Sequence, residues 1–217
     1  MKKTLSIISL LLMAAALGGC QFNRQVKGSG TMKLDKRTVP AFSAVKISGA
    51  FEVEIVAQKE QSLEIEGDDN LLSLVKTEVS NGVLHISTES GFSTKHKISV
   101  RISVPTLDGV DTSGACDIVA TNVKSDEFKI DASGAGTLQV SGETKKLDVD
   151  ISGAGEVDAK DLHAQFVDIN SSGAAKADVY ATEELTADVS GAGNVNYYGD
   201  PKVVNEDKSG AGSISKR

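Results

Sequence analysis

The sequence is poor in the residues from which most metal and catalytic sites are built. Its 217 residues include no Trp and only three His, three Tyr and two Cys. His85, His96 and His163 are scattered without an HxH or HExxH spacing, so a zinc site has no support. No GxSxG sequence occurs, which leaves a serine hydrolase without support as well. Because the chain has no Trp, it has few aromatic rings on which a sugar could stack. The best aromatic patch is "NYYGDP", with Tyr197 and Tyr198.

Positive charge is also in short supply. The chain has 23 Lys and Arg against 30 Asp and Glu, which gives a formal net charge of −7. An acidic balance of this kind disfavours nucleic acid and anionic lipid surfaces as partners.

The apolar run from Leu5 to Leu17 follows Lys2 and Lys3 and is too short for a comfortable membrane span. With small residues before Cys20, this pattern indicates a signal peptide over residues 1–19, and "LGGC" resembles the lipobox of bacterial lipoproteins. We therefore expect Cys20 to carry lipid and anchor the chain in the cell envelope. Since Gln21 rather than Asp follows, the outer membrane is the expected destination. Cys116 then remains as the single free thiol, which excludes an intramolecular disulfide.

The phrase Ser-Gly-Ala occurs seven times, first at Ser48 and then at Ser113. From Ser113 onward its copies are 20, 19, 20, 18 and 19 residues apart, a period typical of a solenoid in which each repeat stacks on the last. The flanking residues alternate between apolar and polar, as in "TLQV" and "FKID", so the repeats are strands rather than helices. Equivalent strands are expected to stack in parallel about 4.8 Å apart.

Between the alternating runs, each Ser-Gly phrase must turn the chain. Gly supplies backbone angles closed to other residues, and Ala is small enough to point into a tight corner. A phosphate-binding glycine loop would need a following helix and usually a Lys, and neither is present. The predicted structural corner residues are Ser113, Gly114, Ser133, Gly134, Ser152, Gly153, Ser172, Gly173, Ser190, Gly191, Ser209 and Gly210.

An acidic residue recurs two positions before these serines, where the alternation points it outward. The resulting column comprises Asp111, Asp131, Asp150, Asn170, Asp188 and Asp207. Neighbouring carboxylates at about 4.8 Å repel by roughly 0.9 kcal/mol in water, so something should offset the repulsion. We favour hydrogen bonds from the amides of the next corner, as Asp accepts in turns. The alternative is a Ca²⁺ ladder with the five aspartates as metal ligands, although the GGxGxDxUx pattern of calcium-binding β-rolls is absent. No other cofactor is expected.

The order of these elements resembles a known family. A lipobox, a first strand "FSAVKISGAFEVEI", a "GVLHI" strand and repeated "DxSGAG" coils are similar to the family described as putative auto-transporter adhesin, head GIN domain, over roughly residues 38–212. The resemblance implies an all-β fold, a single-stranded parallel β-helix of the pectin lyase type with coils of about 19–20 residues, which we expect to be right-handed. It also implies a role in cell adhesion, with no catalytic residues to carry over.

Three segments follow from this interpretation. Residues 1–19 form the signal peptide, residues 20–37 the lipidated Cys and its tether, and residues 38–217 the β-solenoid head domain. Within the head, residues 38–106 are expected to form irregular β coils or a cap, and residues 107–217 the regular coils.

The leading hypothesis is a lipid-anchored envelope protein, not an enzyme, whose solenoid is a binding or adhesion surface for a glycan or protein at the cell surface. One alternative is an enzyme acting on polysaccharide, for which Asp68 and Asp69 are a candidate acid/base pair, although such a pair is more often a solvated turn. The body of the chain has only Arg24, Arg37 and Arg101 to serve as the basic residue of a β-helix lyase. The other alternative is a structural protein that self-assembles into a homo-oligomer through the open edge of its solenoid.

Overall fold

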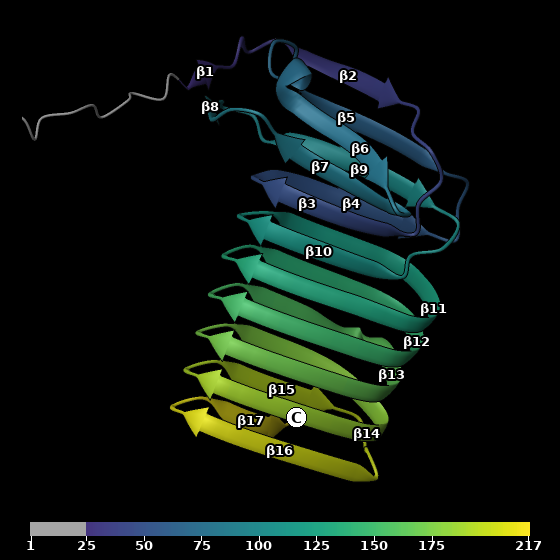
Figure 1. The fold of residues 1–217 in the computed structure, drawn as a ribbon, viewed down its shortest axis with the longest axis vertical. Coiled ribbons are helices and arrows are strands. Elements are labelled where there is room, and N and C mark those ends of the chain that lie inside the picture. Colours follow the sequence, from purple (N-terminus) through teal and green to yellow (C-terminus); the bar gives the residue numbers. More distant parts are fainter. Residues whose placement is uncertain (1–24) are drawn as a thin grey trace, which may run out of the picture.

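The computed structural model describes residues 25–217, and the predicted signal peptide and Cys20 lie outside them. The chain winds into a flattened solenoid whose coils stack along one axis, with the irregular N-terminal strands at one end and the C-terminus at the other (Figure 1). The predicted all-β parallel solenoid is confirmed.

Seventeen strands and one short 3₁₀ helix make up the described residues. The irregular part comprises β1 (Val26–Lys27), β2 (Met32–Arg37), β3 (Ala44–Gly49), β4 (Phe51–Ala57), β5 (Ser62–Asp68), η1 (Leu72–Leu74), β6 (Val75–Ser80), β7 (Val83–Thr88), β8 (Phe92–Ser93) and β9 (Ile98–Val104). The coils comprise β10 (Gly109–Gly114), β11 (Asp117–Gly134), β12 (Thr137–Gly153), β13 (Glu156–Gly173), β14 (Lys176–Gly191), β15 (Asn194–Tyr198), β16 (Val203–Gly210) and β17 (Ser213–Lys216).

The strands of the solenoid form two sheets, which are joined at the bends of β11 to β14. The front sheet runs in the order β6, β7, β3, β10, the second halves of β11 to β14, and β16. The back sheet runs β2, β5, β9, β4, the first halves of β11 to β14, β15 and β17. All pairs within the coils are parallel, whereas β2 with β5, β5 with β9 and β6 with β7 are antiparallel.

A single apolar core fills the space between the two sheets. The positions that alternation assigned to the interior are buried, and they stack on one another in columns from coil to coil. One column comprises Ile118, Leu138, Val157, Ala177, Val195 and Ile214, and another comprises Phe128, Leu147, Val167 and Leu185. The parallel stacking therefore follows directly from the two-residue period of the sequence.

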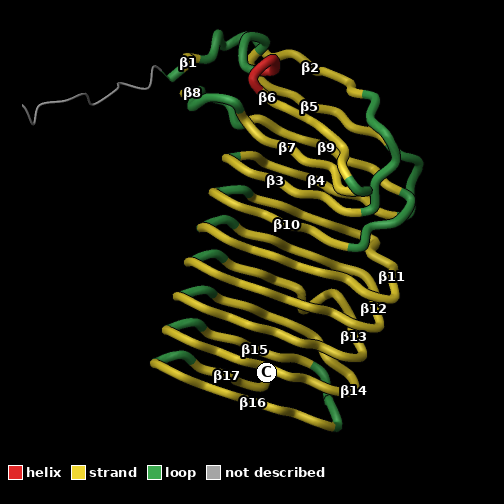
Figure 2. Tube along the Cα trace, viewed as in Figure 1, coloured by secondary structure: helices red, strands yellow, loops and turns green. Residues whose placement is uncertain are grey.

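The Ser-Gly phrases lie where strands end, at the edge opposite the bends of the long strands (Figure 2). Each corner carbonyl of Gly accepts a hydrogen bond from the next coil, as when Ala154 N donates to Gly134 O at 2.9 Å. Gly153 has a φ of 115°, and a Cβ there would lie 2.6 Å from Gly134 O. Glycine is thus required both for the backbone angle and for the close approach of neighbouring coils.

The expectation that Ala points into the corner was wrong. Ala135 and Ala154, in the third place of the phrase, are exposed. The fourth residue faces inward instead, as Cys116 and Ala175 show with 1% exposure each. Because the chain leaves the corner directly into the next inward-facing strand position, this fourth place is where size is limited.

The N-terminal cap begins earlier than the predicted head boundary at residue 38. β2, which falls in the segment assigned to the tether, pairs along its whole length with β5 and is the edge of the back sheet. Leu71 and Leu72, around η1, are buried at this end of the core. The alternation of β2 is weak, with Met32 and Leu34 exposed, which explains why the sequence pattern did not reveal this strand.

In the last described coil, charged residues occupy two inward positions that are apolar in the coil before it. In the register of β14 with β16, Ala187 pairs with Glu206 and Val189 with Lys208. The Glu206 carboxylate and the Lys208 ammonium lie 3.2 Å apart, and all of β16 is exposed. Inward-pointing charges on an edge strand oppose the addition of a further strand.

Candidate binding surface

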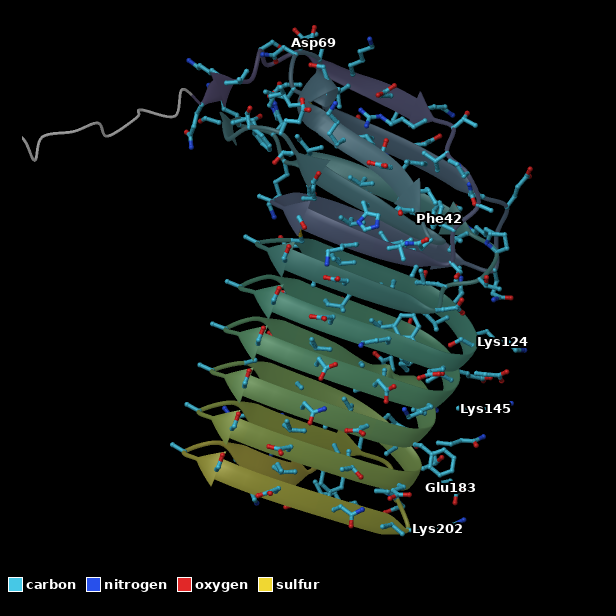
Figure 3. All side chains as sticks on the ribbon, viewed as in Figure 1. Phe42, Asp69, Lys124, Lys145, Glu183 and Lys202 are labelled. Carbon is cyan, nitrogen blue, oxygen red and sulfur yellow. The ribbon has the colours of Figure 1, made fainter. Side chains whose placement is uncertain are left out.

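The predicted acidic column is continuous on the outer face of the front sheet. Strand register aligns Asp111, Asp131, Asp150, Asn170, Asp188 and Asp207 in one row, and Lys46 of β3 precedes them. Figure 3 shows the outward side chains of this sheet repeating from coil to coil. No group of three or more His, Cys, Asp or Glu within residues 25–217 is arranged to hold a metal ion.

The favoured explanation for the column was wrong. The amides of the corners donate to glycine carbonyls of the preceding coil, not to the aspartates. Part of the repulsion is offset by cations and amides instead. The Lys46 ammonium lies 2.5 Å from the Asp111 carboxylate, Lys129 lies 3.8 Å from Asp150, and Asn170 Nδ2 donates to Asp150 Oδ1 at 3.3 Å. The hydrogen bond and the charge of Asp111 raise the pKa of Lys46, so the Lys46 ammonium stays charged at neutral pH.

The predicted corner serines form a second row beside the aspartates. Ser48, Ser113, Ser133, Ser152, Ser172, Ser190 and Ser209 are in register. Ser113 Oγ donates to Ser48 Oγ at 2.8 Å, whereas Ser133 Oγ and Ser172 Oγ each donate to a carbonyl of the coil before. None of these hydroxyls contacts a base, so the row contributes polar groups to the surface and not a nucleophile.

The back sheet has a buried ionic cluster on its outer side. Asp178 is only 5% exposed, and its carboxylate accepts hydrogen bonds from Asn196 Nδ2 at 2.7 Å and from Lys176 Nζ at 2.8 Å. Burial by itself would raise the pKa of Asp178, but the bonds from Lys176 and Asn196 hold it below its ordinary value. Lys176 Nζ also donates to Glu156 Oε1 at 2.7 Å. The hydrogen bonds to Asp178 and Glu156 raise the pKa of Lys176.

A groove of about 600 Å³ crosses the back sheet where β9, β4, β11 and β12 meet. Its polar lining is mainly acidic and includes Glu52, Glu54 and Asp117, with Arg101 as the basic member. Arg101 Nη1 donates to Glu66 Oε2 at 3.2 Å, and Lys97 contacts Asp117 at 2.7 Å. Glu52, Glu54 and Asp117 are exposed, and Asp117 is paired with Lys97, an arrangement that suits a binding surface better than proton transfer.

The candidate acid/base pair is divided between two environments. Asp68 is buried at 1% exposure and accepts hydrogen bonds from Gly30 N at 2.9 Å and from Thr94 Oγ1. Asp69 is exposed and accepts from Ser29 Oγ at 2.6 Å. The solvated-turn interpretation is therefore wrong for Asp68, whose carboxylate joins the connection before β2 to the loop before β9.

The histidines are not brought together, since His85 lies on β7, His96 before β9 and His163 at the bend of β13. His163 does, however, stack on Tyr180 with ring centroids 4.3 Å apart and planes 14° from parallel. Tyr198 is in register with Tyr180, so the three rings form one row along the bend edge. Tyr197 of the predicted aromatic patch is instead 9% exposed and belongs to the core.

Sequence reasoning missed this row because the bends differ in length. Tyr180 and Tyr198 each lie eight residues after their corner Ser, but His163 lies eleven residues after Ser152. The register of β13 with β14 shifts between Ala159 and His163, which restores the alignment. A fixed offset from the Ser-Gly phrase cannot find residues beyond such a shift.

Comparison with known proteins finds one matching family and several solved structures with this architecture. The family model described as "Putative auto-transporter adhesin, head GIN domain" matches residues 41–201. No curated protein matches the chain. Within residues 25–217, no helix has the length and apolar character needed to cross a membrane.

Solved structures share the fold. A putative adhesin from Bacteroides fragilis matches with a TM-score of 0.73 and 24% identity, over 88% of this chain and 100% of its own. A putative adhesin and a putative lipid binding protein, both from Parabacteroides distasonis, each match with a TM-score of 0.56, at 22% and 19% identity, over 89% of this chain and 100% of theirs. At these identities the likeness concerns the fold.

Proposed function

We propose that this chain, which belongs to the head GIN domain family of auto-transporter adhesins, is a lipid-anchored envelope protein whose solenoid is a non-catalytic adhesion surface. The family match is the observation that carries the proposal, because it spans most of the cap and most of the coils. The outer surface supports it, since rows of Asp and of Ser repeat from coil to coil along the front sheet. Such rows offer many equivalent weak contacts to a repetitive partner.

The anchor that we propose at Cys20 places the cap end toward the membrane. Five residues separate Cys20 from Val26, the first residue of β1, and at about 3.3–3.6 Å per residue they span at most about 20 Å. The regular coils then lie farther out than the cap, along an axis of about 38 Å for nine front-sheet strands. The outer membrane remains the destination that we propose on the basis of Gln21.

Binding of the soluble form, residues 21–217, to an array of glycans and envelope polymers tests the proposal. Each polymer is also assayed for cleavage, and each measurement is repeated with Ca²⁺ and with a chelator. Saturable binding without cleavage is the expected result. Cleavage of any polymer would contradict the non-catalytic role, and loss of binding in chelator would return the Ca²⁺ ladder to consideration.

A further inference from the structure

The bend edge of the solenoid carries a second open groove, separate from the groove on the back sheet. Its cavity volume is about 580 Å³, within the range of small-molecule sites. Four consecutive coils line it, with Lys124, Ser125, Asp126, Glu143, Thr144, Lys145, His163, Ala164, Gln165 and Thr182. Lys124 and Lys145 project from this edge in neighbouring coils, above Glu183 and Lys202 (Figure 3). We call it the bend groove.

The charges of the bend groove balance. Two ammonium groups, from Lys124 and Lys145, face two carboxylates, from Asp126 and Glu143, and Lys145 already lies 2.7 Å from Asp126. A phosphate or a carboxylate entering the groove would therefore meet negative charge as well as positive. This balance contrasts with the acidic front sheet and favours an uncharged ligand.

The remaining polar groups of the groove are three hydroxyls, from Ser125, Thr144 and Thr182, and the Gln165 amide. Thr144 Oγ1 donates to Lys146 O at 3.0 Å and lies 3.2 Å from Ser125 Oγ, and Thr182 Oγ1 donates to Ala164 O at 3.3 Å. Because these protons are used within the protein, the hydroxyl oxygens remain as acceptors, whereas the Gln165 amide can both donate and accept. Sugar hydroxyls can donate to the fixed hydroxyl oxygens and pair with the amide, so they match this lining.

One end of the groove is aromatic. His163 lines the groove and stacks on Tyr180, which is followed in register by Tyr198. His163 itself is exposed, and the stack on Tyr180 fixes the plane of its imidazole. An oriented ring beside hydroxyl and amide groups can pack on the C–H face of a sugar while its hydroxyls are hydrogen-bonded.

We propose that the bend groove binds a neutral oligosaccharide or polysaccharide, packed on His163 and hydrogen-bonded by Gln165 and the hydroxyl groups. This assignment rests on the proposed adhesion function and names the class of its ligand. Because the groove crosses four coils along the solenoid axis, it suits several consecutive units of a linear glycan.

The test uses residues 21–217 and three uncharged soluble polysaccharides, mannan, dextran and galactan, with anionic alginate for comparison. The chain has no Trp, so its emission comes from three tyrosines, and Tyr180 stacks on His163 of the groove. Binding is followed by this emission and by calorimetry. We expect saturable binding of at least one neutral polysaccharide and a change in tyrosine emission.

Two groove variants and one control locate the site. His163→Ala and Gln165→Ala should each weaken binding about tenfold, whereas His85→Ala, on the outer side of the front sheet, should leave it within about twofold. Circular dichroism confirms that each variant is folded. Unchanged binding by His163→Ala, binding of alginate alone, or no neutral ligand would overturn the assignment. If cells or other envelope polymers still bind in those cases, the proposed adhesion function stands without it.

Discussion

At the scale of single residues, the corner glycines are the positions with the least freedom to change. In Gly153 two constraints coincide, a positive φ and a carbonyl oxygen at 2.6 Å from where a Cβ would lie. Gly82 has only the positive φ, of 76°, because no atom lies within 4 Å of the place that a Cβ of residue 82 would occupy. The two residues therefore separate backbone strain from coil-to-coil contact.

Gly153→Ala should destabilise the domain by about 3 kcal/mol or more, because the coils must move apart to admit the methyl group. Gly82→Ala should cost about 1 kcal/mol, from the backbone angle alone. Urea unfolding of both variants measures the difference. Equal losses would show that the close approach of the coils contributes nothing.

The Asp178 cluster gives a prediction for pH. Because the folded-state pKa of Asp178 lies below its ordinary value of about 3.9, the ionised form contributes stability above pH 4 and loses it as pH falls through the folded pKa. Asp178→Asn should therefore be less stable than the parent at pH 7, by about 1 kcal/mol, and this difference should shrink below pH 4.

Unfolding free energies from pH 2.5 to pH 7 measure this effect, with Asp126→Asn as the control. Asp126 forms an ion pair but is 86% exposed, so its replacement should change little. A difference between Asp178→Asn and the parent that stays constant over the whole range would refute a contribution from the charge.

At the scale of elements, the acidic column couples strands that are far apart in sequence. Asp131 lies between Asp111 and Asp150 in register. Asp131→Asn should therefore stabilise the coils by a few tenths of a kcal/mol to about 1 kcal/mol at low salt, and less in 1 M salt. Thermal unfolding at both salt concentrations tests the sign. Destabilisation would mean that the Asp131 carboxylate makes a favourable interaction.

The charges on β16 give a prediction for self-association through the C-terminal edge of the front sheet. Replacing Glu206 and Lys208 together with Val leaves the net charge unchanged but completes the apolar columns of Ala187 and Val189. This double variant should self-associate through β16, since an apolar edge strand no longer resists pairing. The parent chain should remain monomeric, because its inward charges oppose the end-to-end assembly considered as an alternative above.

Light scattering after size exclusion gives the mass of each form. The control replaces Asn205 and Asp207, which occupy outward positions of the same strand, with Val. If this control associates as strongly as the inward variant, then general hydrophobicity and not the edge geometry is responsible.

The coils were predictable because most inward positions of β10 to β15 have an apolar residue at a constant distance from the nearest Ser-Gly-Ala phrase. The edge strand β2 of the cap was not, since both of its apolar residues, Met32 and Leu34, are exposed and its partner β5 begins 25 residues after β2 ends. The Asp column was located correctly in register but not in its contacts, because Lys46 reaches Asp111 from 65 residues away. Similarly, the His163 row lies beyond bends whose lengths vary.

At the scale of the whole molecule, the membrane anchor that we propose depends on one residue. Cys20 and Cys116 are the two cysteines of the chain, and Cys116 is buried at 1% exposure in the first regular coil. Burial, the largest influence, raises the pKa of the Cys116 thiol, so this residue is a poor nucleophile for modification. An anchor, if attached through sulfur, must therefore be attached at Cys20.

Cys20→Ser should release the protein from the membrane fraction, whereas Cys116→Ser should leave it there, since the buried thiol serves only packing. Without residues 1–19 the chain has a net charge of −9, so the domain has no electrostatic attraction to anionic lipid. The Cys20→Ser variant should therefore not stay on the membrane through its charge. Fractionation of cells that express each variant, with the mass of the N-terminal peptide, measures both anchoring and lipid. Membrane association that persists in Cys20→Ser would place the anchor elsewhere and remove the argument that the coils point away from the membrane.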